Sequence, residues 1–174
     1  RLNMEGKKMY DRLTKKDIEK MEKEIEHRKL VVRKEALEDV KEARAHGDLS
    51  ENFEYKAAKK FKNENESRIR YLEKMIKTAQ IVEDEASSEE VGLNDRVRVY
   101  MEDEDCEEEY KIVTTIRSNA LKNMISIESP LGKALLGHKK DDSVFVQVKE
   151  KVGYYVKILE IMKSDDESEA INKF

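Results

Sequence analysis

Two apolar stripes of helical spacing, one before and one after a short acidic turn, constrain this chain more than any other feature. Within each stripe the apolar residues recur at steps of three or four, or once of two such steps, which places them on one face of a helix. The stripes consist of Ile18, Met21, Ile25, Val32, Ala36, Val40 and Ala43, and then of Ala57, Phe61, Ile69, Leu72, Ile76 and Ala79. Corresponding residues, such as Met21 and Ile76 or Val40 and Ala57, have numbers that add to 97. Facing positions of an antiparallel hairpin have this property, so the sequence predicts two long helices folded together about a centre near residues 48–49.

The ends of the first predicted helix carry matching signals. Thr14-Lys15-Lys16-Asp17 has the form of a capping box, and Gly47 stands where glycine commonly follows a helix. A helix from about Asp17 to about His46 would be roughly 45 Å long at 1.5 Å per residue. The same register places Arg28 and Asn65 in the seam, which predicts a polar and weaker segment within the coiled coil.

After the second stripe the periodicity changes from helical to alternating. We expect a hairpin over residues 1–82, a polar linker over 83–92, a C-terminal domain over 93–163 and an acidic, disordered tail over 164–174. The predicted strands lie at residues 97–99, 110–113, 124–127, 144–148 and 154–158. A short helix is expected from Ser129 and Pro130 to Gly137. These elements predict an α+β fold: a helical hairpin followed by a small, mostly antiparallel domain.

Composition excludes several classes of protein. No apolar run is long enough to span a membrane and no secretory segment is visible, so we expect a cytoplasmic protein without a membrane partner. A single cysteine, Cys106, excludes an intrachain disulfide, and the three histidines have no zinc-ligand spacing. Residues 1–82 hold 22 Lys and Arg against 17 Asp and Glu, whereas residues 83–174 hold 13 against 22. The basic hairpin either meets an anionic partner or is simply solvated, and composition does not decide between these readings.

The acidic turn contains the residues of greatest chemical interest. Asp48 and Glu51 fall between the two helices and could present oxygen ligands to a metal ion. Their spacing is also that of a capping box at the start of the second helix. From spacing alone capping is the more frequent role, and the two roles are compatible.

The turn, together with segments of the second helix and of the C-terminal domain, resembles the bacterial Gre transcript-cleavage factors, of the GreA type. The resemblance rests on Gly47-Asp48-Leu49-Ser50-Glu51-Asn52 with Glu54-Tyr55, on Ser67-Arg68-Ile69-Arg70-Tyr71-Leu72-Glu73, and on Ile125 to Gly137 with its Ser129-Pro130-Leu131-Gly132 segment. It extends over residues 13 to 162. It implies that the hairpin is a coiled coil and that the C-terminal domain is similar to FK506-binding proteins.

This resemblance also implies a function. Such factors bind bacterial RNA polymerase, insert the coiled coil into its secondary channel and stimulate cleavage at the 3′ end of backtracked RNA. The factor is not itself an enzyme: Asp48 and Glu51 would help to hold a second Mg²⁺ in the polymerase active centre, and no cofactor is bound by the factor alone. We expect a monomer.

Further roles are expected by position. Gly47, Asn52 and Tyr55 would shape the tip, and Arg44 and Lys59 would either lie near RNA or only solvate their helices. The segment Ser129, Pro130, Leu131 and Gly132 would contribute to polymerase binding, although Leu131 also has the character of a core residue. Phe53 replaces the small residue usual in the family and makes the tip bulkier.

Two alternative functions remain open at this stage. An inhibitory relative with the same fold would block the polymerase channel without stimulating cleavage, although a plug has no need of the pair Asp48 and Glu51. A prolyl isomerase would need an aromatic-lined pocket, and the C-terminal domain has few aromatic residues and no tryptophan.

Overall fold

The computed structural model describes residues 11–47 and 52–173. These residues form two compact units, a helical one within residues 18–79 and a second one made of residues 12–17 and 80–173. The helical unit ends at Ala79, close to the predicted hairpin boundary at residue 82, and residues 12–17, which include the start of the first helix, group with the second unit. Val91, in the predicted linker, is fully buried in that unit. None of the described helices is long and apolar enough to cross a membrane.

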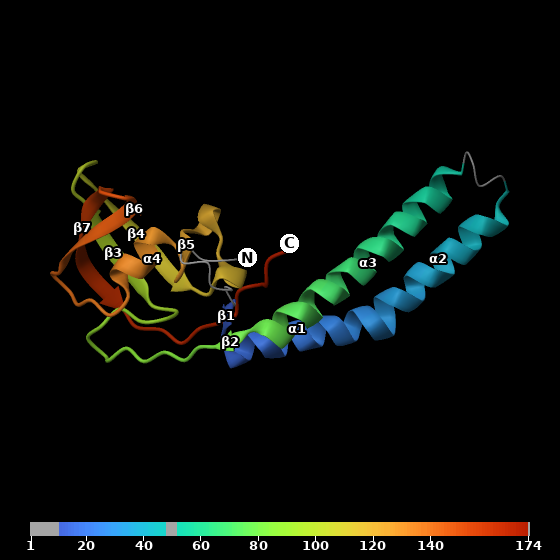
Figure 1. Cartoon of the computed structure of the whole chain (residues 1–174), viewed down its shortest axis with the longest axis horizontal. Coiled ribbons are helices and arrows are strands. Elements are labelled where there is room, and N and C mark those ends of the chain that lie inside the picture. Colours follow the sequence, from blue (N-terminus) through green and yellow to red (C-terminus); the bar gives the residue numbers. More distant parts are fainter. Residues whose placement is uncertain (1–10, 48–51, 174) are drawn as a thin grey trace. The chain divides into compact units, whose positions relative to one another are not determined.

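The first unit is the predicted helical hairpin. Its helices are α1 (Lys15–His27), α2 (Arg33–Ala45) and α3 (Phe53–Thr78), and a π-helical turn (Arg28–Val32) joins the first two. Figure 1 shows α3 running back along α2 and α1. The buried apolar side chains come from the two predicted stripes and from one further residue, Met75: they are Met21, Ala36, Val40, Ala43, Ile69, Leu72 and Met75. The hairpin prediction is therefore confirmed.

Local hydrogen bonds explain where the first arm begins, and the backbone conformation of a glycine explains where it ends. The Thr14 amide donates to the Asp17 carboxylate over 3.0 Å, and the Asp17 amide donates to the Thr14 hydroxyl over 3.1 Å. This reciprocal pair is the predicted capping box. At the other end, Gly47 has a φ of +127°, which favours glycine because a Cβ atom would be strained there.

The middle of the hairpin seam is polar and hydrogen-bonded. The Asn65 side chain is 2% exposed; it accepts from Arg28 Nη1 over 3.0 Å and donates to the Arg28 carbonyl over 3.3 Å. The same carbonyl accepts the Arg33 amide in the π-helical turn. Glu24 receives one hydrogen bond from Arg28 and two from the buried Arg68. The predicted polar segment is therefore present, but its polar groups are paired across the seam.

The charges in this polar segment lower the pKa of Glu24, and a second ion pair lies nearer the tip. Burial alone would raise the pKa of Glu24, but hydrogen bonds from Arg68 and Arg28, and the charges of both, hold its pKa below the ordinary value of 4.5. Nearer the tip, Arg33 makes a second cross-helix pair with Glu66, with a 2.7 Å contact from Nε.

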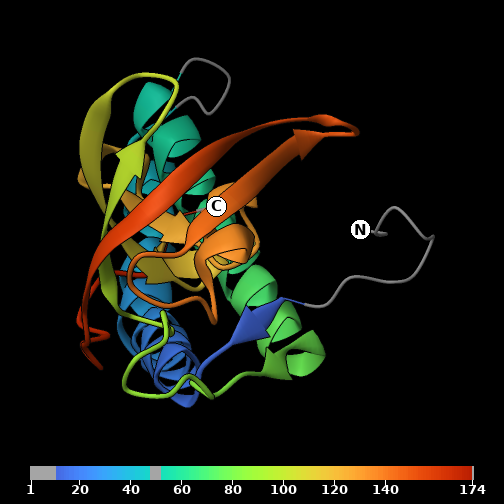
Figure 2. The same ribbon diagram turned by 90° about the vertical axis from the view of Figure 1, so that its left-hand side faces the viewer.

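The second unit is a five-stranded sheet covered by a short helix. Its strands are β3 (Arg96–Met101), β4 (Cys106–Val113), β5 (Met124–Ser126), β6 (Ser143–Lys149) and β7 (Val152–Met162), in the order β5-β4-β3-β7-β6. Only the β4–β5 pair is parallel, so the expectation of a mostly antiparallel sheet is confirmed. Figure 2 shows the long β7 curving beside β6. A further parallel pair, β1 (Arg12–Leu13) with β2 (Gln80–Ile81), was not predicted.

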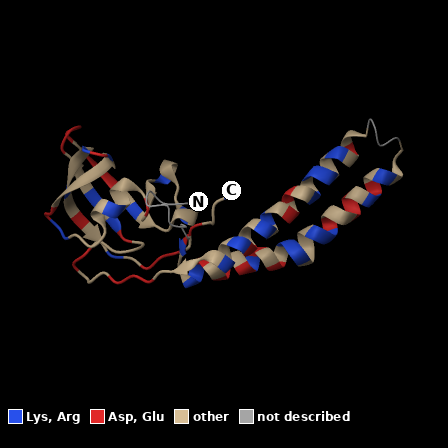
Figure 3. Ribbon diagram, in the orientation of Figure 1, with Lys and Arg blue, Asp and Glu red and all other residues tan. Residues whose placement is uncertain are grey.

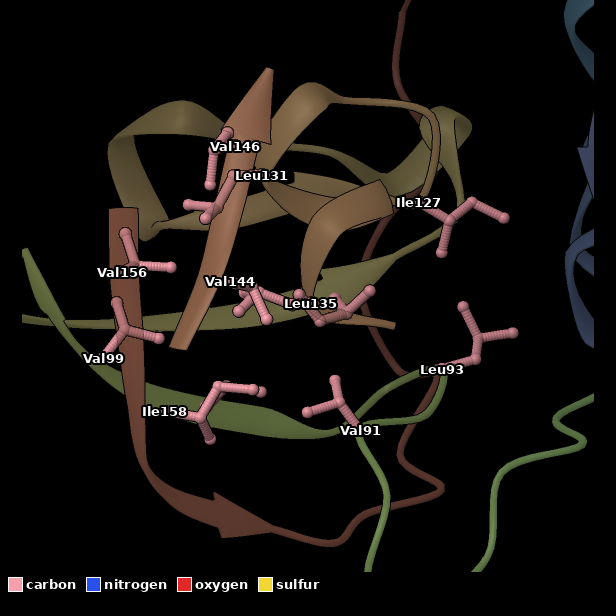
Figure 4. Close-up of a cluster of buried hydrophobic side chains, with 12 residues drawn as sticks. Val91, Leu93, Val99, Ile127, Leu131, Leu135, Val144, Val146, Val156 and Ile158 are labelled. Atoms are coloured by element: carbon pink, nitrogen blue, oxygen red, sulfur yellow. The ribbon is translucent and has the colours of Figure 1, made fainter. Parts of the chain in front are cut away.

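Alternating apolar side chains on the sheet and two leucines of α4 (Pro130–Leu135) form the core of this unit. Figure 4 shows Leu131 and Leu135 among valines from β3, β6 and β7. A fully buried aliphatic side chain contributes roughly 1.5–3 kcal/mol relative to an exposed one. This core therefore provides the rigid platform that carries α4.

The tail corrects one expectation. Residues after Met162 form no helix or strand, yet they are held against the second unit by specific contacts. The Ser164 amide donates to Asp95, Glu167 and Glu169 pair with Arg117, and the Asn172 amide donates to the Ile116 carbonyl. The prediction of a disordered tail is wrong for residues 164–173, because composition cannot report the buried cations that the tail meets.

Candidate functional site

Asn52 connects the two helices at the end of the hairpin. It is the N-cap of α3: its side-chain oxygen accepts a hydrogen bond from the Tyr55 amide over 3.0 Å. Its side-chain nitrogen donates to the Ala43 carbonyl in the last turn of α2, over 2.8 Å. One side-chain amide therefore satisfies a free N–H at the start of one helix and adds a second donor to the Ala43 carbonyl, which also accepts the His46 amide, at the end of the other. This contact supports the predicted tip-shaping role of Asn52.

Arg44 and Tyr55 form a second link across the same end. The Arg44 guanidinium carbon lies 5.6 Å from the centre of the Tyr55 ring, within the range of a cation–π contact. A hydrogen bond from Arg44 holds the pKa of Tyr55 below its ordinary value, with smaller contributions from the charges of Arg44, Lys59 and Lys62. Arg44 is therefore occupied in bracing the tip, whereas Lys59 is exposed on α3.

Phe53 lies on the surface at the first position of α3. Its side chain is 81% exposed, and Lys56 Nζ lies 5.7 Å from the ring centre. The bulk introduced by this residue is thus presented to solvent rather than packed between the helices. Figure 3 shows basic and acidic residues interspersed along both arms, so the small positive excess is not gathered in one block.

Asp48 and Glu51, the predicted metal ligands, lie outside the described residues, between Gly47 and Asn52. Within residues 11–47 and 52–173, no group of three or more His, Cys, Asp or Glu side chains could hold a metal ion. Two carboxylates are a suitable donor set for Mg²⁺, which prefers oxygen ligands, but two ligands leave most of an octahedral shell to other groups. A shared ion, completed by a partner, is the arrangement that this donor set fits.

The predicted polymerase-binding segment has clear structural duties. The Ser129 hydroxyl caps α4 by accepting from the Gly132 amide over 3.1 Å, and it donates to the Ser126 carbonyl over 2.6 Å. Leu131 is buried in the core, and a Cβ on Gly132 would lie 2.1 Å from the Ser126 carbonyl oxygen. Pro130 is exposed. Of the four residues, Pro130 is therefore the most accessible to a partner.

Two contacts between the helices were not predicted from the sequence: Asn52 with Ala43, and Arg44 with Tyr55. The sequence does place each pair symmetrically about the turn, since both pairs lie close to the register of the hairpin. That register could have suggested them, but the hydrogen bonds depend on side-chain conformation and not on spacing.

Comparisons with known proteins agree with this architecture. Residues 12–81 match the family described as transcription elongation factor, N-terminal, and residues 86–163 match transcription elongation factor, GreA/GreB, C-term. Transcription elongation factor GreA of Lachnoclostridium phytofermentans is 42% identical over 154 residues, 88% of this chain and 96% of that protein. GreA of Clostridium kluyveri is 44% identical over 161 residues, 92% of this chain and 100% of that protein.

Solved structures give a further comparison. The GreA factor homolog 1 (Gfh1) protein of Thermus thermophilus is 28% identical, with a TM-score of 0.41 over 89% of this chain and 100% of that one. Both halves of the sequence match in order, and the curated relatives span nearly its whole length. The hairpin with its capped tip and the sheet domain that follows it are therefore those of the GreA/GreB family of transcription elongation factors, to which this chain belongs as a GreA-type member.

Proposed function

We propose that this protein binds RNA polymerase, inserts its helical hairpin into the secondary channel and stimulates the polymerase to cleave backtracked RNA. The observation that carries the proposal is the hairpin end. Two long helices stop at Ala45 and resume at Phe53, and Asn52 joins them there. The two carboxylates of the Gre-like signature, Asp48 and Glu51, belong to this connection.

Each part of the hairpin has a role in this proposal. Asp48 and Glu51 hold Mg²⁺ jointly with the polymerase, and the bound ion supplies positive charge for the attacking and leaving oxygens of the phosphodiester. Asn52 fixes the distance between the helix ends, and the Arg44–Tyr55 pair braces them. The polymerase remains the enzyme and the factor supplies ligands. The sheet domain supplies the docking surface near Ser129 and Pro130.

Charge removal at the tip tests the ligand role. Asp48→Asn and Glu51→Gln keep side-chain size and remove only the negative charge, and the N-cap of α3, Asn52, stays in place. A neutral amide is a much poorer Mg²⁺ ligand than a carboxylate. We expect each variant to fold, to compete with the parent for polymerase and to lose most of the stimulation, with partial recovery at raised Mg²⁺.

Glu54→Gln is the matched control, because Glu54 is exposed in the first turn of α3 and is not one of the two proposed ligands. The assay adds each protein to a stalled, backtracked polymerase and measures short 3′ RNA fragments. Variants of Asp48 and Glu51 that stimulate as well as Glu54→Gln would remove the metal-ligand role. A parent protein that competes for polymerase but releases no fragments would support the inhibitory alternative instead.

A further inference from the structure

Two cations are buried in the second unit at a point that the hairpin mechanism does not use. Lys111, on β4, is 2% exposed and Arg117, in the 3-10 helical turn Thr115–Arg117, is 0% exposed. Leaving a charge buried without a partner costs several kcal/mol, so each of these groups needs an anion beside it. Their anionic partners come from two parts of the unit: the body, residues 12–17 and 80–162, and the tail, residues 163–173.

The body supplies only some of the hydrogen-bond and ion-pair partners of Arg117. Its Nε lies 2.8 Å from the Asp17 carboxylate, and Nη2 donates to the Asn94 side chain over 2.9 Å. Nε also donates to the Thr114 hydroxyl over 3.4 Å. Two contacts come from the tail: Nη1 donates to Glu169 over 2.9 Å and Nη2 donates to Glu167 over 3.2 Å. The outward side of the guanidinium is therefore directed at the tail carboxylates.

Within the described part of the chain, every partner of the Lys111 ammonium group lies in the tail. Its ammonium group donates to the Asp166 carbonyl over 2.7 Å and to the Glu169 carboxylate, and the Asp166 carboxylate lies 3.9 Å away. Glu169 thus bridges both cations. Burial alone would raise the pKa of Glu169, but the hydrogen bond from Lys111 and the charges of Lys111 and Arg117 hold its pKa below 4.5.

Side chains at the two ends of the tail also contact the body: Lys163 pairs with the buried Asp95, and the Asn172 side chain donates to the Thr115 carbonyl. Residues 163–173 form no helix or strand, and the backbone amides of Ser164 and Asn172 are its main-chain donors to the body. Glu167 and Glu169 are two residues apart, and both carboxylates reach Arg117. What the body contacts is therefore a short peptide segment with two carboxylates at this spacing.

We propose that Lys111 and Arg117 form a binding site for a short acidic peptide, which the tail of this chain fills in cis and which an acidic segment of a partner protein can enter by displacing the tail. The site is built to hold anions, because its cations are buried and Lys111 has no other partner in the described structure. A peptide can displace the tail because the tail forms no part of the sheet. A tethered tail has an effective concentration of the order of millimolar, so a competing peptide must approach that concentration.

Neutralising the tail in the full-length chain tests the proposal. In the variant Glu167→Gln/Glu169→Gln the tail loses its charges while both cations stay in place. The probe is a fluorescent peptide with the sequence of residues 163–173, and binding is followed by anisotropy. We expect this variant to bind the peptide at least tenfold more tightly than the parent chain, whose own tail competes. A chain with Asp165→Asn, which alters an exposed tail carboxylate, should behave as the parent.

The peptide provides a second control. A peptide with Gln at both positions should not bind the variant, and added salt should weaken binding of the acidic peptide. Equal binding by parent and variant, or binding of the neutral peptide as tight as that of the acidic one, contradicts the proposal.

A measurement on the parent chain covers the case in which the variant does not fold. Hydrogen exchange at the Asn172 amide, which donates to the Ile116 carbonyl, reports release of the tail. Millimolar acidic peptide should accelerate that exchange several-fold, and the neutral peptide should leave it unchanged. Exchange that is insensitive to the acidic peptide overturns the idea of an exchangeable site.

Discussion

Replacing Asn52 should open the tip by an amount that the structure allows us to divide into two parts. The side chain makes two hydrogen bonds, one to the Tyr55 amide and one to the Ala43 carbonyl. Loss of an N-cap costs about 1 kcal/mol, and loss of a hydrogen bond to a carbonyl costs about 1 kcal/mol. Asn52→Ala removes both, so the free energy for opening the first turns of α3 should fall by about 2 kcal/mol.

Asn52→Ser separates these contributions. Serine caps helices as well as asparagine does, but its shorter side chain cannot also reach the Ala43 carbonyl. We expect it to lose about 1 kcal/mol, half of the alanine effect. The measurement is native-state hydrogen exchange of the amides that begin α3, where these losses correspond to roughly fivefold and thirtyfold faster exchange.

Two outcomes would refute this reasoning. Exchange in Asn52→Ala within twofold of the parent would mean that Asn52 does not hold the tip closed. Equal exchange in the serine and alanine variants would mean that the cap contributes nothing and the link to α2 contributes everything. Cleavage stimulation measured on the same variants should fall in the order parent, serine, alanine if tip geometry matters for the proposed function.

Four further predictions concern other parts of the chain. Because its pKa is lowered, ionised Glu24 should stabilise the hairpin above about pH 4.5 and lose this effect as the pH falls through the folded-state pKa. The difference in unfolding free energy between parent and Glu24→Gln, measured by urea titration, should therefore shrink below pH 4.5, and a constant difference would contradict it. Lys59→Ala, which leaves the Arg44–Tyr55 contact in place, should weaken cleavage stimulation more than polymerase binding, with a smaller loss at high salt; a salt-independent effect would argue against RNA contact. Gly132→Ala should destabilise the second unit by about 1–3 kcal/mol in thermal unfolding, because its Cβ meets a backbone carbonyl. Pro130→Ala should leave stability within about 0.5 kcal/mol and weaken binding to polymerase in a competition assay, and unchanged binding would exclude Pro130 from the docking surface.

Much of the fold was predictable because its signals are local and repeated. The apolar stripes, the capping box at Thr14 and the glycine at position 47 each depend on neighbouring residues only. The capping box and the glycine are confirmed, and so are the stripes except near the tip, where Ala57 and Phe61 are exposed. The five strands of the sheet were located by alternation, with ends that differ by several residues in places. The parallel pair β1 and β2 was missed because two residues are too few to show any period.

The missed features depend on residues far apart in the sequence. Lys111 interrupts an apolar strand and would ordinarily point to solvent, and its burial makes sense only beside Glu169. The acidic tail was read as disordered for the same reason. At the tip, Gly47 has a positive φ and Asn52 links the two helices. The tip-shaping roles of these residues and the ligand roles of Asp48 and Glu51 stay predictions.

The paired charges in the hairpin seam have a mechanical consequence. Glu24 with Arg68 and Arg33 with Glu66 cross-link the two arms at different heights, and Asn65 adds a third link at the π-helical turn. Sliding one helix past the other by one residue would move these partners by about 1.5 Å and stretch all three links together. A load applied along the axis is therefore shared by both helices. Slippage of one arm along the other would therefore have to break all three links at once.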